Sequence, residues 1–200
     1  MIYADLHIHT IYSSDSIIQP KTLVDMLAAH SFIKVAAVTD HDSVRGCRAT
    51  VELAKAYSDI LIIPGVEITT PKGDVLVLGT EELPPRPWTP EAVADYAKNV
   101  NAVSIVAHPF RQYGMGNYAR NLKVDAIEVQ NGGSNSKANS EAKELALSMG
   151  LPGTAGSDAH QVSELFSVNS RITASLNIDS ILKGIKKGLI SSQPTRTLSS

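Results

Sequence analysis

Six histidines stand out in this 200-residue sequence as the side chains best able to do chemistry. Five of them lie at or just past the end of a short apolar run, and most have an acidic residue within two positions. Imidazole nitrogens and carboxylate oxygens are donors that bind divalent metals in proteins. The pattern therefore predicts a metal site. The five histidines are His7, His9, His41, His108 and His160.

The spacing of the first motif supports this interpretation. Alternate side chains of an extended strand share a face, so Asp5, His7 and His9 are predicted to lie together. Two imidazoles on one face can hold one divalent ion. Asp158 and His160 repeat the spacing with a carboxylate. A single histidine at a strand end is usually an ordinary polar residue, but burying so many polar groups without a partner would be costly.

Short runs rich in Val and Ile alternate with stretches of helical periodicity. This alternation predicts an α/β fold with a mostly parallel sheet, either a compact barrel or an open doubly wound sheet. The carboxyl ends of parallel strands meet at one edge, so the histidines are expected to converge there. Helices are expected at 22–29, 136–149 and 179–187, and another should begin at Pro90 after the N-cap Thr89. The expected strands are Tyr3–Ile8, Val35–Thr39, Ile60–Ile68, Asp74–Leu78, Ala102–Ala107, Ala126–Val129, Gly153–Ala155 and Val168–Ile172.

The amino-acid composition argues against several classes of function. With 18 basic and 20 acidic residues the formal net charge is −2, so the chain as a whole has no attraction for nucleic acid or a membrane surface. The single cysteine, Cys47, excludes a disulfide framework and a cysteine-rich zinc site. The absence of a signal-peptide pattern and of a long apolar run favours a cytoplasmic protein without a membrane partner. Residues 1–200 are expected to form one domain, with 191–200 as a loose tail.

Five segments, read in order, carry a family resemblance. They are Asp5–Thr10, Thr39–Asp42, Gly65–Glu67, Ala107–Pro109 and Ser157–His160. In this order they resemble the PHP (polymerase and histidinol phosphatase) family of metal-dependent phosphoesterases, and the region 171–188 is similar to the family's last strand and helix. The resemblance implies an α/β fold of the PHP type, a distorted (β/α)7, TIM-like barrel. It also implies a trinuclear metal site at the carboxyl ends of the strands.

The resemblance further implies which side chains hold up to three divalent ions (Mn, Fe, Zn or Mg). One carboxylate, Glu67, would bridge the first two ions. The implied ligands are His7, His9, Glu67 and Asp158 for the first ion, Glu67 and His108 for the second, and His41 and His160 for the third.

Two positions depart from the family pattern. Where the family usually has another histidine for the second ion, this chain offers Asp74. An oxygen ligand shifts the preference toward Mn²⁺, Fe²⁺ or Mg²⁺ over Zn²⁺, although Asp74 could instead be a loop carboxylate. The third ion needs a further ligand soon after His9. Asp15 is the candidate, and a turn or helix-capping role is its alternative.

Further residues are expected around the ions. Asp5, Asp40 and Asp42 are candidates to accept the second ring N–H of a ligating histidine, with helix capping as the alternative for Asp42. Arg111 is the first choice for a phosphate contact and Arg45 the second, and a plain surface position is the alternative for each. The weaker candidates are Glu128 and Asn131 near the site, the loop 131–135, the loop aromatics Trp88, Tyr113 and Tyr118, and the basic patch Lys183, Lys186 and Lys187.

These features predict a metal-dependent phosphoesterase that hydrolyses a phosphomonoester, such as a nucleotide or an oligonucleotide end, with a metal-bound hydroxide. A small phosphorylated molecule is thus the expected partner. The alternatives are a histidinol-phosphate-type phosphatase and a non-catalytic PHP-like module of a nucleic-acid-processing assembly. A hydrolase of amides on a related barrel would use a carboxylated lysine, and no lysine ends a predicted strand here. The expected catalytic residues are His41, Asp158, His160 and Arg111, and either Asp15 or His160 could protonate the leaving group.

Overall fold

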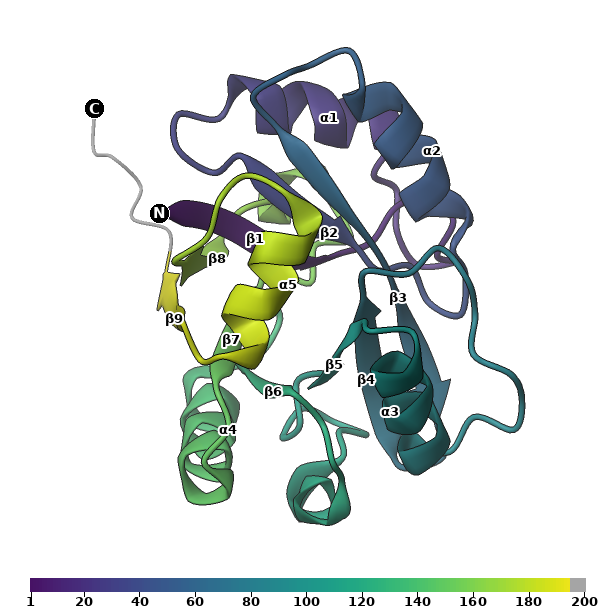
Figure 1. Ribbon diagram of the computed structural model, residues 1–200, viewed down its shortest axis with the longest axis vertical. Coiled ribbons are helices and arrows are strands. Elements are labelled where there is room, and N and C mark those ends of the chain that lie inside the picture. Colours follow the sequence, from purple (N-terminus) through teal and green to yellow (C-terminus); the bar gives the residue numbers. More distant parts are fainter. Residues whose placement is uncertain (195–200) are drawn as a thin grey trace.

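The computed structural model describes residues 1–194 and shows one nine-stranded sheet surrounded by helices (Figure 1). The helices of the described chain are α1 (Pro20–Ala29), α2 (Arg45–Ala54), α3 (Pro90–Asn99), α4 (Ser136–Met149) and α5 (Ile178–Lys186), with short 3-10 helices η1 (Gly116–Asn121) and η2 (Val162–Glu164). The strands are β1 (Ile2–Ile8), β2 (Val35–Val38), β3 (Leu61–Thr70), β4 (Gly73–Leu78), β5 (Val103–Val106), β6 (Ala126–Asn131), β7 (Gly153–Gly156), β8 (Val168–Ile172) and β9 (Ile190–Pro194).

The sheet curls into a nearly closed barrel, with strand order β7-β6-β5-β4-β3-β2-β1-β8-β9. The predicted barrel is confirmed. The parallel pairs are β1 with β2, β2 with β3, β5 with β6, and β6 with β7. The pairs that involve β4, β8 or β9 are antiparallel. The expectation of a mostly parallel sheet is therefore wrong for these three strands. Between β3 and β4 the reason is the connection, because Pro71 and Lys72 are too few residues for a parallel crossover.

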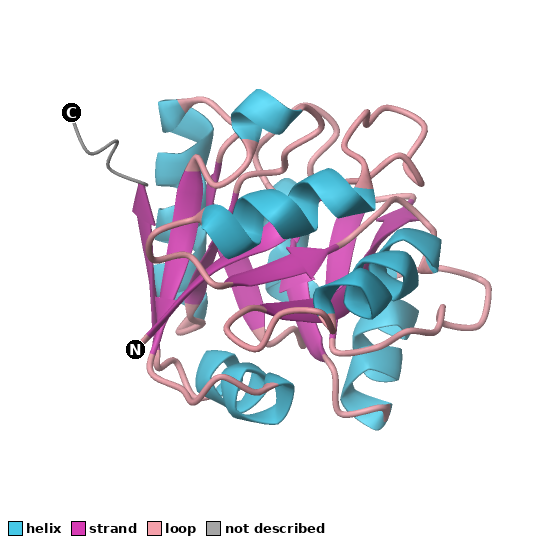
Figure 2. Ribbon diagram, turned by 90° about the horizontal axis from the view of Figure 1, so that it is seen from above, coloured by secondary structure: helices cyan, strands magenta, loops and turns pink. Residues whose placement is uncertain are grey.

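Two apolar clusters bury the strands from both sides. The inner cluster fills the barrel and includes Ile181, Leu182 and Ile185, so α5 packs against the barrel interior. The outer cluster joins the strands to α1, α2, α3 and α4, which surround the sheet (Figure 2). Each large apolar side chain buried in this way stabilises the fold by about 1.5–3 kcal/mol. The result is a rigid frame around the strand ends.

A register shift in β1 decides which side chains enter the barrel. Between Asp5 and Ile8, β1 contains one residue more than the paired stretch of β2. Leu6 packs in the inner cluster, whereas Ile8 packs in the outer one. The extra residue therefore turns His7 to the same side as His9 and leaves Asp5 on the opposite face. The prediction that Asp5 shares a face with the two histidines is wrong for this reason.

The barrel closes where the end of β1 meets the segment after β7. The N–H of Asp158 donates to the carbonyl of His7 at 2.8 Å, and the N–H of His9 donates to the carbonyl of Ala159 at 3.0 Å. Gly156 permits this close approach, because a Cβ at this position would lie 2.3 Å from the Cβ of His7. We call this contact, between residues 7–9 and 156–159, the seam of the barrel.

Local sequence signals place several element ends. The side chain of Thr89 accepts a hydrogen bond from the N–H of Ala92 at 3.2 Å, and Gly150 ends α4 with φ of 66°, as predicted. The predicted loose tail is wrong for residues 191–194, which belong to β9 and pair with β8. Residues 195–200 lie outside the described residues. Within the described chain, no helix combines the length and apolar character needed to cross a membrane.

Candidate metal centre

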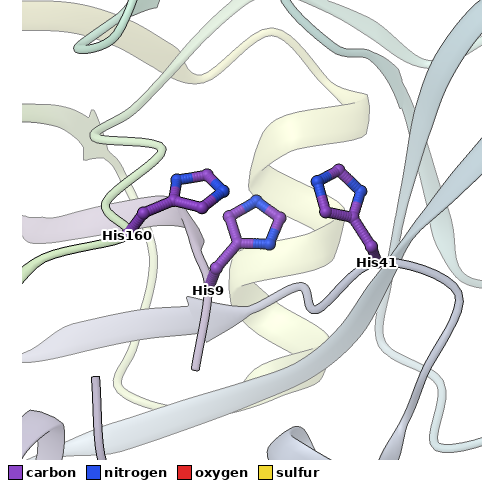
Figure 3. A group of neighbouring side chains, drawn as sticks. All are labelled: His9, His41 and His160. Carbon is purple, nitrogen blue, oxygen red and sulfur yellow. The ribbon is translucent and has the colours of Figure 1, made fainter. Parts of the chain in front are cut away.

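Strand ends bring five of the six histidines together. His7 belongs to β1 and His9 follows it directly, while His41, His108 and His160 come shortly after β2, β5 and β7. Figure 3 shows His9, His41 and His160 with their rings side by side and the ribbon of α5 behind them. The ring of His9 lies 4.5 Å from that of His41 and 4.2 Å from that of His160, centre to centre. The predicted convergence of the strand-end histidines is therefore present in the structure.

The carboxylate of Glu67 lies at the centre of these histidines and is fully buried. Its Oε2 is 3.1 Å from Nε2 of both His7 and His9, and 3.3 Å from Nδ1 of His41. Its Oε1 is 3.0 Å from Nε2 of His108. Imidazole nitrogens thus surround both oxygens of one side chain. This is the arrangement that a carboxylate shared between two ions requires.

Asp158 completes a tight group with Glu67 and two histidines. Its Oδ1 lies 3.1 Å from Nε2 of His9 and 3.4 Å from Nε2 of His7, and these two nitrogens are 3.0 Å apart. Atoms that bind one ion at about 2.0–2.2 Å are separated from each other by about 3.0–3.5 Å. The observed separations match this range. The four side chains therefore fit a single divalent ion, as the resemblance implies.

A second group contains Glu67, Asp74 and His108, whose candidate ligand atoms lie within 4.8 Å of one another. Asp74 lies in β4, directly opposite Thr69 of β3. Burial raises the pKa of Asp74, and the negative charge of Glu67 raises it further. A bound cation would oppose both effects, because it stabilises the charged form of the Asp74 carboxylate. Asp74 thus joins Glu67 and His108 in a group that could hold a metal ion.

The third group is more open than the other two. Oδ2 of Asp15 lies 3.3 Å from Nε2 of His160 and 3.7 Å from Nε2 of His41. The Asp15 side chain is 53% exposed, and both histidines are partly exposed. His9 lies within reach of the same group but directs its Nε2 toward Asp158. The side chains with candidate ligand atoms within 4.8 Å of one another here are His9, His41 and His160, and Asp15 lies at their open edge.

Hydrogen bonds to the second ring nitrogen define the protonation of two of these histidines. Nδ1 of His7 lies 3.0 Å from a carboxylate oxygen of Glu128, and Nδ1 of His160 lies 2.8 Å from the carbonyl oxygen of Asp158. A carboxylate and a carbonyl only accept, so each Nδ1 carries a proton. Each Nε2 can then present its lone pair to the site. Metal-binding histidines are commonly held in this way.

Ser13 is the hydrogen-bond partner of the second ring nitrogen of His9. Its Oγ lies 3.0 Å from Nδ1 of His9, 3.0 Å from Oδ1 of Asp40 and 2.9 Å from the backbone nitrogen of His41. A hydroxyl donates one hydrogen bond and can accept two. Because Ser13 donates to the Asp40 carboxylate and accepts from the backbone of His41, its contact with His9 must be a bond from a protonated Nδ1. The sequence analysis missed Ser13, for which its position four residues after His9 was the available signal.

The three aspartates expected to accept ring N–H groups have other roles, so that prediction is wrong for each of them. Asp5 lies on the far side of β1 and bonds backbone N–H groups, and burial raises its pKa to about 6. Asp40 reaches His9 only through Ser13. Asp42 points to the neighbouring strand. Their partners are the N–H groups of His7, Ser157 and Phe166 for Asp5, Thr10 for Asp40, and Thr69 for Asp42.

The buried acids make the site attractive to positive charge. Burial by itself would lower the pKa of His9, but Asp158 and Glu67 outweigh it and raise that pKa to about 9. Burial would raise the pKa of both acids, yet the facing histidines hold each well below its usual range. Among the described residues, the buried Nδ1 atoms of His41 and His108 also make no hydrogen bond, although that of His41 lies 3.3 Å from Oε2 of Glu67. This set of nitrogen and oxygen donors fits divalent cations.

Arg111 lies beside the first group. Its guanidinium donates to Oδ2 of Asp158, the oxygen that does not face His9. The side chain of Asn131 donates to the same oxygen at 3.2 Å and to Glu128 at 3.0 Å. The structure thus brings Arg111, Glu128 and Asn131 to the site.

The remaining candidates make contacts of other kinds. Arg45 lies over the ring of Tyr12, with 5.1 Å between the guanidinium carbon and the ring centre. Arg86 covers Trp88, and Tyr113 is exposed to solvent. Tyr118 donates to Glu91 at 2.7 Å, and Lys186 of the basic patch reaches Asn101 at 3.3 Å. In the described part of the chain, none of these side chains contacts the histidine groups.

Two regions of the chain match known family models. Residues 5–106 match the model described as PHP domain, and residues 136–190 match the model described as PHP-associated. The chain belongs to the PHP family. The two matches include the segments with His7, Glu67 and Asp158, whereas His108 lies in the stretch between them.

Relatives of this PHP protein share its fold at low sequence identity. An uncharacterized protein of Methanocaldococcus jannaschii is 31% identical over 140 residues, which cover 64% of this chain and 81% of the relative. A two-domain protein from Bacteroides vulgatus, which contains a predicted PHP-like metal-dependent phosphoesterase, superposes with a TM-score of 0.78 and 20% identity. That match covers 96% of the PHP chain, which spans 64% of the longer protein. An amidohydrolase from Chromobacterium violaceum with bound sulfate matches with a TM-score of 0.69 and 15% identity, over 94% of this chain and 97% of that one.

Proposed function

We propose that this PHP protein is a metal-dependent hydrolase of phosphate monoesters. The proposed substrate is a nucleotide or an oligonucleotide end, and the proposed cofactors are up to three divalent ions (Mn, Fe, Zn or Mg). The observation that carries the proposal is the arrangement around Glu67, whose two buried oxygens face four imidazoles at 3.0–3.3 Å. A shared carboxylate of this kind supports adjacent ions, and adjacent ions suit phosphoester chemistry.

The chain would hold each ion with a different set of side chains. His7, His9 and Asp158 would share the first ion with Glu67, and Asp74 and His108 would share the second with it. Asp15, His41 and His160 would hold the third at the more open edge. When bound, such ions activate water and offset the negative charge of the phosphate. Uncatalysed hydrolysis of phosphate monoesters is among the slowest biological reactions, which is why one general base would not suffice.

Arg111 has the position and chemistry to bind the phosphate. Its planar guanidinium can donate two parallel hydrogen bonds to phosphate oxygens. Its Nη1 already donates to Asp158, so the side chain is anchored beside the first group rather than free to sample solvent. Asn131 holds the same carboxylate from another direction. The two side chains together would orient Asp158 and one face of the substrate.

The leaving oxygen must take up a proton, and the open edge offers two donors. Asp15 and His160 lie 3.3 Å apart and are both accessible to solvent. Their pairing gives either group a partner from which its proton can be replaced. Either side chain could supply this proton only while it holds no ion, because an atom that binds the third ion cannot donate a proton.

The proposal is tested by metal content together with phosphate release. The purified protein is stripped with a chelator, reloaded separately with Mn²⁺, Fe²⁺, Zn²⁺ and Mg²⁺, and assayed for phosphate release from nucleotides and short oligonucleotides. We expect bound metal, loss of activity on stripping and recovery on reloading. His41→Ala should lose activity, whereas His30→Asn should not, because His30 lies outside the metal groups. A protein that binds no metal, or a His41→Ala variant with full activity, would refute the proposal.

The same assay separates the alternatives. A histidinol-phosphate-type phosphatase would release phosphate from that compound in preference to nucleotides. A non-catalytic module would bind metal but release phosphate from none of the esters. Hydrolysis of amides without phosphate release would favour amidohydrolase chemistry. Such an enzyme would need a carboxylated lysine as the shared ligand, whereas the side chain that faces the imidazoles here is Glu67, and this favours the phosphoesterase.

A further inference from the structure

A pocket of about 400 Å³ opens beside the metal centre. Asp158 and His160 line it and also belong to the metal groups, so the pocket starts where a phosphate ester would react. Its other walls come from the loop after β6 and from the region around η2. The side chains of Ser163, Glu164 and Ser167 line it there. The pocket therefore extends from the phosphate position toward a wall that the metal centre does not use.

Most of the side chains that line this pocket are polar. Apart from the imidazole of His160, none of its lining residues is aromatic, and none has an aliphatic side chain. Within the described chain, the hydroxyl groups of Ser163 and Ser167 make no hydrogen bond, so both can bond to a ligand. Glu164 is anchored, because its Oε2 accepts from the N–H groups of His160 at 2.8 Å and Gln161 at 3.0 Å. The wall thus presents two available hydroxyls beside a fixed carboxylate.

Two glycines keep this wall accessible. A Cβ at Gly132 would lie 2.7 Å from Oγ of Ser167 and 2.5 Å from the carbonyl oxygen of Ser157. A Cβ at Gly133 would lie 3.1 Å from Nη1 of Arg111. Side chains at these two positions would crowd the hydroxyl of Ser167 and the guanidinium of Arg111. The pocket is therefore shaped so that both polar groups stay within reach of a ligand.

We propose that this pocket binds the leaving group of the substrate and selects an alcohol that carries further hydroxyl groups, as a sugar or the ribose of a nucleotide does. The inference rests on the proposed function, because it takes the reacting phosphate to lie at the metal centre. Hydroxyl groups of the ligand can donate to Glu164 and exchange hydrogen bonds with Ser163 and Ser167. An apolar group would remove these side chains from water without replacing their hydrogen bonds.

The test compares two esters that differ only in hydroxyl groups, glycerol 1-phosphate and propyl phosphate. We expect kcat/KM to be about tenfold higher for glycerol phosphate, since each hydrogen bond at an exposed wall contributes about three- to tenfold. The double variant Ser163→Ala and Ser167→Ala should reduce this preference to about threefold or less. The readout is the ratio of the two kcat/KM values, so a loss of activity common to both esters cancels. Ser140→Ala, on the exposed face of α4, is the matched control and should retain the full preference.

A binding measurement keeps the inference separate from the proposed function. Glycerol phosphate should shift the backbone amide resonances of residues 163–167, and propyl phosphate should shift them less. If neither ester is hydrolysed but the double variant abolishes this difference, the pocket assignment holds and the phosphatase proposal fails. Equal resonance shifts with both esters, an equal kcat/KM for both, or a preference that survives in the double variant would each overturn the inference.

Discussion

The hydroxyl of Ser13 accepts a hydrogen bond from Nδ1 of His9 at 3.0 Å and thereby determines which nitrogen of that ring faces Glu67 and Asp158. Ser13→Ala should leave His9 free to rotate and to change tautomer. Loss of such a partner typically costs 10- to 100-fold in metal affinity. We expect a decrease of about that size in calorimetric titrations with Mn²⁺ or Zn²⁺. Ser140→Ala is the control, and an unchanged affinity in Ser13→Ala would show that His9 needs no such partner.

Glu67→Gln tests the carboxylate that faces four imidazoles. The amide keeps the shape of the side chain but loses its charge, and it can offer only one oxygen to an ion. We expect the protein to bind at least one metal equivalent less and to lose activity by about 100-fold or more. Elemental analysis of the purified variant measures the metal. Glu144→Gln, at an exposed position of α4, should retain wild-type metal content. Full metal content in Glu67→Gln would contradict a shared ligand.

Arg111→Lys separates phosphate binding from support of Asp158. Lysine keeps the positive charge but lacks the planar fork that matches two phosphate oxygens. We expect KM to rise about tenfold, with metal content and kcat near wild type. Steady-state kinetics give KM and kcat, and elemental analysis of the same preparation gives the metal content. If metal content falls in parallel with activity, Arg111 acts by holding Asp158 and not by binding the substrate.

Gly46→Ala tests the packing behind the metal groups. A Cβ at Gly46 would lie 1.8 Å from Oδ2 of Asp40, which must then move. Asp40 accepts the N–H of Thr10 at 2.6 Å and the hydroxyl of Ser13, so the displacement should reach His9. We expect the free energy of unfolding to fall by about 2–4 kcal/mol in urea titrations. Glu52→Ala, on the exposed side of the same helix, should change it by less than about 0.5 kcal/mol.

Cys47 provides a pH dependence that does not involve the metal groups. Burial raises the pKa of its thiol from 9.0 to about 11. The folded protein therefore holds this proton more tightly than the unfolded chain, and stability should fall as pH rises from about 9 to 11. The slope is at most about 1.4 kcal/mol per pH unit. Urea titrations across this range should show the decline in the wild type, and Cys47→Ala should show a smaller one. Equal slopes in the two proteins would mean that the thiol does not titrate abnormally.

Much of the site follows from features that are visible in the sequence. Apolar runs rich in β-branched residues mark the strands, and His41, His108 and His160 come after three of them. Their convergence then follows from the geometry of a barrel, because strands that run in the same direction end at the same edge. Asp158 is brought in by the same rule, whereas Glu67 lies within β3, which continues beyond it to Thr70. This part of the prediction needed no knowledge of side-chain contacts.

The remaining features depend on backbone details that residue types do not reveal. The extra residue in β1 lies in a stretch without glycine, and it separates Asp5 from His7 although a regular strand would place them on one face. The partner of the His7 ring is instead Glu128, which lies 121 residues away. Strand β9 is polar between Ser191 and Gln193 and gains its structure by pairing with β8. Tertiary contacts decide each of these cases.

The seam of the barrel has a consequence for how the protein is made. It joins segments about 150 residues apart in the sequence, and its residues His7, His9 and Asp158 are also candidate ligands. During synthesis on the ribosome, the chain therefore has only part of the ion-binding group. The group becomes complete when the last third of the chain has been made and has closed the barrel. Long-range closure of this kind comes at an entropic cost that favours late formation. An ion that binds both segments would stabilise the closed barrel. The free energy that holds the first and last parts of the chain together would then depend on the supply of metal in the cell.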